Sequence, residues 1–220
     1  MLFTFDIETL PTDDESVIAE LAKGIKPPGT IKKPESIVTW HEENGAQALS
    51  DAISKTSFDG LYGRIACISF AIGDSEPATV DSRDGEAEML VDFYSHIEEN
   101  WSMRDAYIFC GHNLVGFDLQ FLKARSIILG IKPPAIVISA MNAKPWDSCI
   151  ADTMLMWSPD REKRASMDKL CKAFGSEGKG DFDGSMVAGT WPLNPKKVID
   201  YCEYDVRRTR EIYKRITFSN

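Results

Sequence analysis

Four carboxylates and one tyrosine, in three short segments, are the residues of this chain with the clearest capacity for chemistry. They are Asp6 and Glu8 in FDIET, Asp118 in GHNLVGFDLQFL, and Tyr201 with Asp205 in YCEYDV. Apolar residues of the kind that form buried structure surround each segment. An unpaired carboxylate is very costly to bury unless something compensates its charge. Several such groups, supplied by separate elements, therefore indicate a divalent-metal site.

The spacing of these residues allows them to converge on one pocket. Asp6 and Glu8 are two apart on a predicted strand, so they face one side with backbones about 6–7 Å apart. Tyr201 and Asp205 are four apart on a predicted helix and share one face, while Asp118 begins another helix just after a buried strand. Oxygen ligands alone favour Mg²⁺ or Mn²⁺ over zinc, and no two of the three histidines have ligand spacing.

The hydrophobic periodicity predicts an α/β fold in which helices flank a mixed sheet. We expect residues 1–220 to form one domain, with an insertion at about 11–62 that is irregular apart from one helix. Three strands come first, followed by alternating helices and strands and then by helices. The expected strands are 2–9, 63–74, 78–82, 105–112 and 147–153, and the expected helices are 36–54, 86–101, 116–129, 166–174 and 195–216.

The charge of the chain is unevenly distributed. The net charge is −9, which argues against a nucleic-acid partner. Residues 74–105, however, contain ten acids and two bases, whereas the loop at 22–34 has four lysines and no acid. The chain can therefore be acidic on average and basic locally. The acidic stretch could dock a partner protein or could be an exposed helix that keeps the protein soluble.

The composition predicts a cytoplasmic protein with no membrane contact. No apolar run approaches the length that spans a bilayer, and the N-terminus lacks the features of a signal peptide. The five cysteines have no CxxC spacing, which favours free thiols. For a phage-encoded protein, the expected location is the host cytoplasm.

The three segments FDIET, GHNLVGFD and YCEYDV resemble the three motifs of the DEDD superfamily of 3′→5′ exonucleases. Tyr201 lies four residues before Asp205, and this spacing resembles that of the tyrosine subgroup. In the histidine subgroup the catalytic residue lies one position earlier, and this chain has Asp200 at that position. The chain looks in particular like stand-alone bacterial and phage proteins related to the proofreading domain of family-B DNA polymerases. This resemblance spans residues 5–206 and implies a ribonuclease H-like fold. The insertion at 11–62 departs from the polymerase domains.

The resemblance also implies a two-metal-ion mechanism with two Mg²⁺ or Mn²⁺ ions. Asp6 would bind both ions, Glu8 and Asp205 would complete the nucleophile-side site, and Asp118 would hold the leaving-group ion. Tyr201 would aim the attacking water. Such ions activate water and stabilise the departing 3′ oxygen. The expected reaction removes nucleoside 5′-monophosphates from 3′ ends of single-stranded or frayed DNA.

Four neighbours of these residues are candidates for substrate contact. Asn113 and Phe117 belong to the second motif and could touch the terminal nucleotide. The structural alternative is that Asn113 forms hydrogen bonds at the end of the strand and that Phe117 packs in the core. Thr9 and Leu10 follow the first motif and could touch the terminal sugar or wedge against its base, and the alternative is a strand-to-loop transition.

Other polar and aromatic residues have mainly structural interpretations. We expect solvated positions for Lys23, Lys26, Lys32 and Lys33, with contact to the DNA backbone as the alternative. We expect a polar helix face for Arg207, Arg208 and Arg210. For Trp157 and Trp191 we expect core or loop-anchoring roles, with stacking on single-stranded bases as the alternative. We expect capping or loop roles for Asp147, Asp152 and Asp183.

Two alternative functions remain open from the sequence. RNA 3′-end trimming is one, because discrimination depends on contacts to the 2′-OH that a sequence does not reveal. A non-catalytic scaffold that binds nucleic acid or a replication or recombination partner is the other. All four motif acids and Tyr201 are present, which favours the enzyme.

Overall fold

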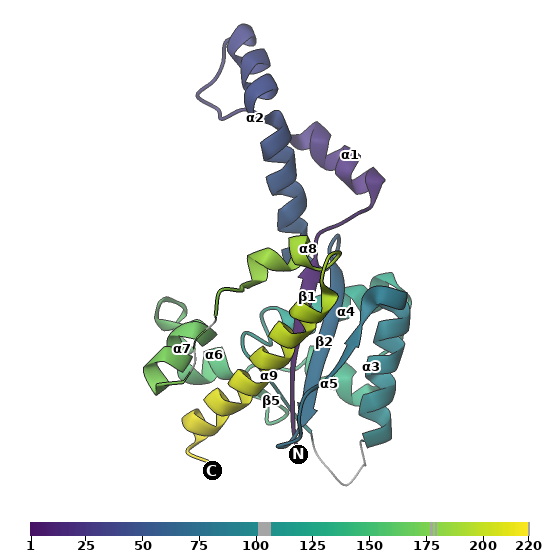
Figure 1. The fold of residues 1–220 in the computed structure, drawn as a ribbon, viewed down its shortest axis with the longest axis vertical. Coiled ribbons are helices and arrows are strands. Elements are labelled where there is room, and N and C mark those ends of the chain that lie inside the picture. Colours follow the sequence, from purple (N-terminus) through teal and green to yellow (C-terminus); the bar gives the residue numbers. More distant parts are fainter. Residues whose placement is uncertain (101–106, 177, 179, 220) are drawn as a thin grey trace.

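A computed structural model describes residues 1–100, 107–176, 178 and 180–219, and its framework is one five-stranded mixed sheet (Figure 1). The strand order is β3-β2-β1-β4-β5. β2 is antiparallel to both β1 and β3, while β4 and β5 run parallel to β1 and to each other. The strands are β1 (Leu2–Leu10), β2 (Arg64–Ile72), β3 (Ala78–Asp81), β4 (Ile108–Gly111) and β5 (Ile150–Asp152).

Helices follow the strands in the predicted order, and the mixed helix-covered sheet is confirmed. The long C-terminal helix begins at Pro195, as predicted. The helices outside the β1–β2 connection are α3 (Glu86–Asn100), α4 (Asp118–Ile128), α5 (Ala135–Met141), α6 (Thr153–Trp157), α7 (Met167–Phe174), α8 (Val187–Thr190) and α9 (Pro195–Thr217). The 3-10 turns are η1 (Thr56–Phe58), η2 (Ser82–Asp84), η3 (Arg161–Lys163) and η4 (Gly184–Met186).

The two faces of β1 have different roles, because alternate residues of a strand point to opposite sides. Phe3, Phe5 and Ile7 are buried in the main core, together with side chains of α3, α4 and α5. Asp6 and Glu8 alternate with them. The other face of the sheet is crossed by α9, which packs on β1, β2 and β4 (Figure 1). The predicted carboxylate pair therefore lies on the α9 side.

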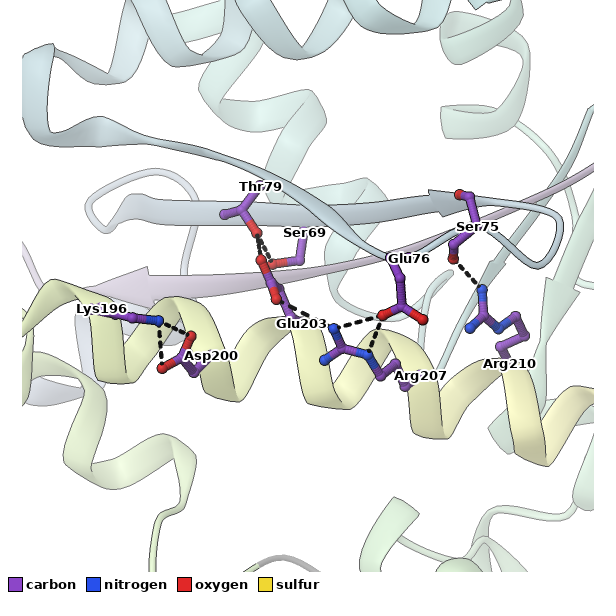
Figure 2. A network of polar contacts seen from close by, with 9 residues as sticks. All are labelled: Ser69, Ser75, Glu76, Thr79, Lys196, Asp200, Glu203, Arg207 and Arg210. Carbon is purple, nitrogen blue, oxygen red and sulfur yellow. Dashed lines mark hydrogen bonds and ion pairs between the residues drawn. The ribbon is translucent and has the colours of Figure 1, made fainter.

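One flank of α9 is tied to β2 and β3 by a polar network (Figure 2). Glu203 accepts a hydrogen bond from Thr79 Oγ1 at 3.1 Å, and Thr79 Oγ1 lies 2.8 Å from Ser69 Oγ. Further along the helix, Arg207 pairs with Glu76 at 3.0 Å. A helix turns about 100° per residue, so the flank opposite Glu203 and Arg207 carries positions 201, 205 and 208. The network thus sets the rotation of α9 that presents the third motif.

The connection between β1 and β2 forms a helical arm that extends away from the sheet (Figure 1). Its helices are α1 (Glu15–Gly24) and α2 (Pro34–Lys55), and neither has a buried residue. The predicted helix at 36–54 is confirmed by α2. The expectation of irregular structure before it was wrong, since residues 15–24 are helical. Asp14 caps α1 by accepting hydrogen bonds from the backbone N–H groups of Ser16 and Val17.

Other differences from the prediction concern short helices and element ends. The helices α5, α6 and α8 were not predicted; each has seven residues or fewer, too few to show a clear period. The predicted helix 86–101 reaches Asn100, and residues 101–106, with the start of the predicted strand 105–112, lie outside the described residues. Within the described residues, no helix combines the length and apolar character that crossing a bilayer requires.

Ion pairs inside the protein use part of the acidic stretch 74–105. Besides Glu76, Asp74 pairs with Lys214 of α9 at 2.8 Å. Glu86, at the start of α3, pairs with Arg125 of α4 at 2.8 Å, and both side chains are 10% exposed or less. Removal of one partner of a buried pair strongly destabilises the folded protein, because the other charge is left buried without compensation. The stretch therefore helps to hold α4 and α9, the helices that carry the second and third motifs.

Candidate active site

The predicted carboxylates meet in one cavity of about 420 Å³. Its walls include Asp6 and Glu8 from β1, Asp118 from the start of α4, and Tyr201 and Asp205 from α9. Three elements that are far apart in sequence thus bring together every residue to which the prediction gave a catalytic or metal-binding role. Glu8, Asp118 and Asp205 are each at most 9% exposed, so these carboxylates are largely withdrawn from bulk water.

Asp6 and Glu8 lie in the middle strand of the sheet, opposite Ser69 and Cys67 of β2. The pairing slips by one residue between Glu8 and Thr9, because β2 has one extra residue, Ala66, between their partners Cys67 and Ile65; a bulge of this kind bends the strand that contains it, here β2. One oxygen of each carboxylate and the Sγ of Cys202 all lie within 4.8 Å of one another. Among the described residues, this is the only group of three or more His, Cys, Asp or Glu side chains whose ligand atoms meet that distance.

Cys202 is an unpredicted neighbour of the pair. Its thiol donates to the backbone oxygen of Asp6 at 3.4 Å and lies 3.6 Å from Oδ2 of the same residue. Burial, and then the neighbouring Cys67 thiol, raise the pKa of Cys202 well above its usual value, so the thiol stays protonated and acts as a donor. The contact fastens α9 to β1 directly behind the carboxylates.

Asp118 is buried with little compensation inside the protein. Burial raises the pKa of Asp118 to about 7, and the charge of Asp152 also raises it, while the backbone N–H groups of Asp118 and Ile7 act in the opposite direction. A carboxyl with this pKa keeps its proton up to about neutral pH. A bound cation would supply the missing charge and favour the ionised form.

Asp152 organises the loop that leads to Asp118. Its carboxylate accepts hydrogen bonds from the backbone N–H groups of Asn113 (3.1 Å) and Val115 (3.0 Å), and it also caps α6. The predicted capping role of Asp152 is confirmed, and the bonds from residues 113 and 115 are a second, unpredicted role of the same carboxylate. Asn113 has a left-handed backbone with φ of 69°, which asparagine tolerates better than most residues. A Cβ on Gly116 would meet Asn113 Oδ1 at 2.5 Å, so only glycine fits beside that side chain.

Tyr201 combines a packed ring with a polar tip in the cavity. Its ring lies against Phe182 at a centroid distance of 5.1 Å, within a cluster that also contains Cys67 and Val198. Burial, then the charges of Asp205, Glu8 and Asp6, and a hydrogen bond with Asp205, raise the pKa of the Tyr201 hydroxyl far above its usual value. The hydroxyl is therefore protonated at neutral pH and serves as a hydrogen-bonding group.

Arg208 corrects one sequence prediction. We predicted a polar helix face for it, but it is only 4% exposed and pairs with Asp205 at 2.9 Å. Its guanidinium also donates to the backbone oxygen of Gly178 and lies 3.9 Å from the centroid of the Tyr204 ring. Arg207 and Arg210 have the predicted helix-surface placement. Arg208 instead supplies a buried positive charge next to a predicted metal ligand.

Three of the four candidate substrate contacts line the cavity, namely Thr9, Asn113 and Phe117. Phe117 also packs against Phe121 at 5.6 Å, so its ring serves the core as well. Leu10 is not among the described residues that line the cavity. Leu10 is the last residue of β1, one residue beyond the predicted end of the strand. Its side chain lies on the same side of β1 as Asp6 and Glu8. It is 5% exposed and lies in the cluster beneath α8 and α9. Leu10 therefore packs in this cluster, and its predicted substrate contact stays a prediction.

Several lining residues escaped sequence analysis. Asp168 is a fifth acidic residue at the cavity, where it also pairs with Lys172 at 2.8 Å. Phe58, in the turn at the base of the arm, is another, and its side chain is prominently exposed. Only the tertiary fold brings these segments to the cavity, and nothing in the local sequence marks them. The others are Ile7, Ser57, His112, Met154, Ser166, Met167 and Gly184.

The other polar and aromatic residues considered in the sequence have local structural contacts. Asp147 and Asp183 accept backbone hydrogen bonds in local turns, as predicted. Trp157 contacts Phe174, and Trp191 packs against the cluster beneath α8 and α9. The four arm lysines are exposed, which confirms their predicted solvated positions, and they are not among the described residues that line this cavity.

Comparison with known proteins places the chain in a family. Residues 61–220 match a family model described as a predicted 3′-5′ exonuclease related to the exonuclease domain of PolB, and the chain belongs to that family. The matched range contains Asp118, Tyr201 and Asp205, whereas Asp6, Glu8 and most of the arm precede it. No curated protein matches the chain.

A solved structure shows the fold. The family B DNA polymerase from the hyperthermophilic archaeon Pyrobaculum calidifontis matches 98% of this chain with a TM-score of 0.60 and 15% sequence identity. The chain spans 24% of that polymerase chain. The likeness confirms the predicted ribonuclease H-like fold, as found in the exonuclease domain of such a polymerase.

Proposed function

We propose that this protein is a metal-dependent 3′→5′ exonuclease that removes nucleoside 5′-monophosphates from the 3′ ends of single-stranded or frayed DNA. The observation that carries the proposal is the convergence of Asp6, Glu8, Asp118 and Asp205 with Tyr201 on one cavity. Membership of a predicted exonuclease family supports the reaction class. The choice of DNA is part of the proposal.

The residues fit a pair of hard divalent cations. The predicted ligands offer carboxylate oxygens, which Mg²⁺ and Mn²⁺ prefer. Burial raises the pKa of Asp118, so a bound cation would favour its ionised form; Asp205 pairs with Arg208 and lines the same cavity. Asp6 would hold both cations, Glu8 and Asp205 would complete one site, and Asp118 would complete the other. When bound, such cations activate water and stabilise the leaving oxygen.

The protein's own residues would orient the reactants. The protonated hydroxyl of Tyr201 can hold and aim the attacking water, since its raised pKa excludes a role as a base at neutral pH. Thr9, Asn113 and Phe117 line the space that a terminal nucleotide would occupy. Water attacks the terminal phosphorus and the bond to the 3′ oxygen of the preceding sugar breaks. The products are a nucleoside 5′-monophosphate and a DNA strand with a new 3′-hydroxyl.

Digestion of end-labelled oligonucleotides tests the proposal. With Mg²⁺ or Mn²⁺, we expect the purified protein to release 5′-mononucleotides stepwise from 3′-labelled single-stranded DNA, and to act more slowly on a blunt duplex. EDTA should abolish release because the carboxylates need the cations. Matched RNA, digested in parallel, measures sugar preference. Internal cuts, or release from the 5′ end first, would contradict the proposal.

A further inference from the structure

The base of the arm presents an aromatic side chain at the rim of the cavity. Phe58 is 74% exposed in the turn η1, and it lines both the carboxylate cavity and a neighbouring hollow of about 320 Å³. Thr9, Ser57 and Gly184 are shared by the two spaces as well. The hollow therefore continues the cavity outward, between the end of α2 and the turn that precedes α8.

The turn that carries Phe58 is anchored on its upstream side to β1. Thr9 Oγ1 donates to the backbone oxygen of Ser57 at 2.7 Å, one residue after Glu8 and one before Phe58. Thr56 is 5% exposed, and its hydroxyl accepts from the backbone N–H of Thr12 at 2.8 Å. These bonds hold Phe58 at a fixed distance from Asp6 and Glu8, the carboxylates of β1.

The downstream side is anchored to α4. A Cβ on Gly60 would meet the Ala124 Cβ at 2.8 Å, so the backbone lies directly on that helix. Arg125 Nη1 also donates to the backbone oxygen of Gly60 at 3.3 Å. Phe58 is thus an exposed ring on a backbone held at both ends, which is how a rigid contact residue binds with little loss of conformational entropy.

The chemistry of the hollow matches a single nucleic-acid strand. A cavity of a few hundred Å³ encloses one ligand of about the size of a nucleotide, so the nucleotide before the terminal one must lie outside the carboxylate cavity. Among the described residues that line the hollow, Lys55 is the only cationic side chain and Asp51 the only acidic one, and the Lys55 ammonium group can meet a phosphate. Proteins that bind single strands pair such cations with aromatic rings on which bases stack.

We propose that Phe58 stacks on the base of the second nucleotide from the 3′ end and so positions the terminal phosphodiester over the carboxylates. This inference rests on the proposed exonuclease function. Stacking of one base on an aromatic ring corresponds to roughly 5- to 150-fold in affinity. Phe58→Ala is therefore expected to raise the KM for single-stranded DNA by about tenfold or more, with a smaller effect on kcat. Phe58→Tyr should restore the KM.

An abasic substrate separates stacking from a general structural effect. An oligonucleotide that lacks the base at the second position should raise the KM of the wild type, but should change the KM of Phe58→Ala by less than about twofold. Trp146→Ala is the matched control: Trp146 is 77% exposed and precedes β5, at the end of the sheet away from Asp118. It should behave as the wild type on both substrates.

The possible failures can be told apart. If the wild type digests DNA but the abasic substrate affects the wild type and Phe58→Ala equally, the stacking proposal is overturned and the exonuclease proposal stands. An unchanged KM in Phe58→Ala has the same meaning. If the wild type releases no nucleotide with either cation, the proposed function fails and this inference fails with it. Melting curves of Phe58→Ala, which we expect to match the wild type, exclude loss of folding.

Discussion

Asp6→Asn is expected to lower the rate of nucleotide release by at least about a thousandfold, while the protein stays folded. Asp6 lies on the central strand, with one carboxylate oxygen within 4.8 Å of ligand atoms of Glu8 and Cys202, and the proposed function makes it a ligand to both cations. Asparagine keeps the shape of the side chain and removes its charge. Loss of one electrostatic contact to a transition state typically lowers kcat by about 10²–10³, and loss of a ligand shared by two ions should exceed that range.

The stability of this variant gives an independent check. Without divalent cations, the negative charges of the cavity repel one another, so removal of one should leave the melting temperature unchanged or raise it. The matched control is Asp200→Asn, because Asp200 lies on α9 and pairs with Lys196 at the surface. Release rates should be normal in the control. More than about a tenth of wild-type activity in Asp6→Asn would contradict the assigned ligand set.

Arg208→Ala is expected to destabilise the protein by about 3–5 kcal/mol, because the substitution removes the buried cation that pairs with the carboxylate of Asp205. The two side chains are 4% and 5% exposed. For a protein of this size the loss corresponds to a fall in melting temperature of roughly 6–20 °C. Activity should fall as well, since Asp205 would lose the contact that fixes its position.

Added cations should reverse part of this loss. An ion that binds the native carboxylates stabilises the native state by mass action, so Mg²⁺ or Mn²⁺ should raise the melting temperature of Arg208→Ala more than that of the wild type. Arg207→Ala is the control, one residue away, where the ion pair with Glu76 is exposed and should contribute about 1 kcal/mol or less. Equal destabilisation of the two variants would contradict this prediction, because it would mean that the buried Arg208–Asp205 pair contributes no more to stability than the exposed Arg207–Glu76 pair.

The sequence was sufficient for the features that depend on local period and order. Alternation along residues 2–9 predicted which side of β1 carries Asp6 and Glu8, and the spacing of Tyr201 and Asp205 predicted their shared helix face. The order of the strands and the long helix predicted the mixed sheet. In each case a short-range pattern determines the direction of a side chain, and the motif order then assigns the elements to one site.

Contacts between distant segments could not be predicted in the same way. Arg208 shares the helix face of Tyr201 and Asp205, but its charge favours a surface position, and its contact with Gly178 depends on how α9 docks. Cys202 contacts Asp6 across almost two hundred residues of chain. Phe58 reaches the cavity because the arm returns to β1 through Thr56 and Thr9. Such placements arise from tertiary packing, which the local sequence does not encode.

Manganese binding tests most directly the claim that the four carboxylates hold paired divalent cations. Crystals of the wild type soaked in Mn²⁺ should show two anomalous peaks roughly 4 Å apart, with Asp6 between them, Asp118 on one ion, and Glu8 and Asp205 on the other. Asp6→Asn crystals should lose at least one peak. Mn²⁺ bound only outside this cavity, or no peak at millimolar Mn²⁺, would contradict the account.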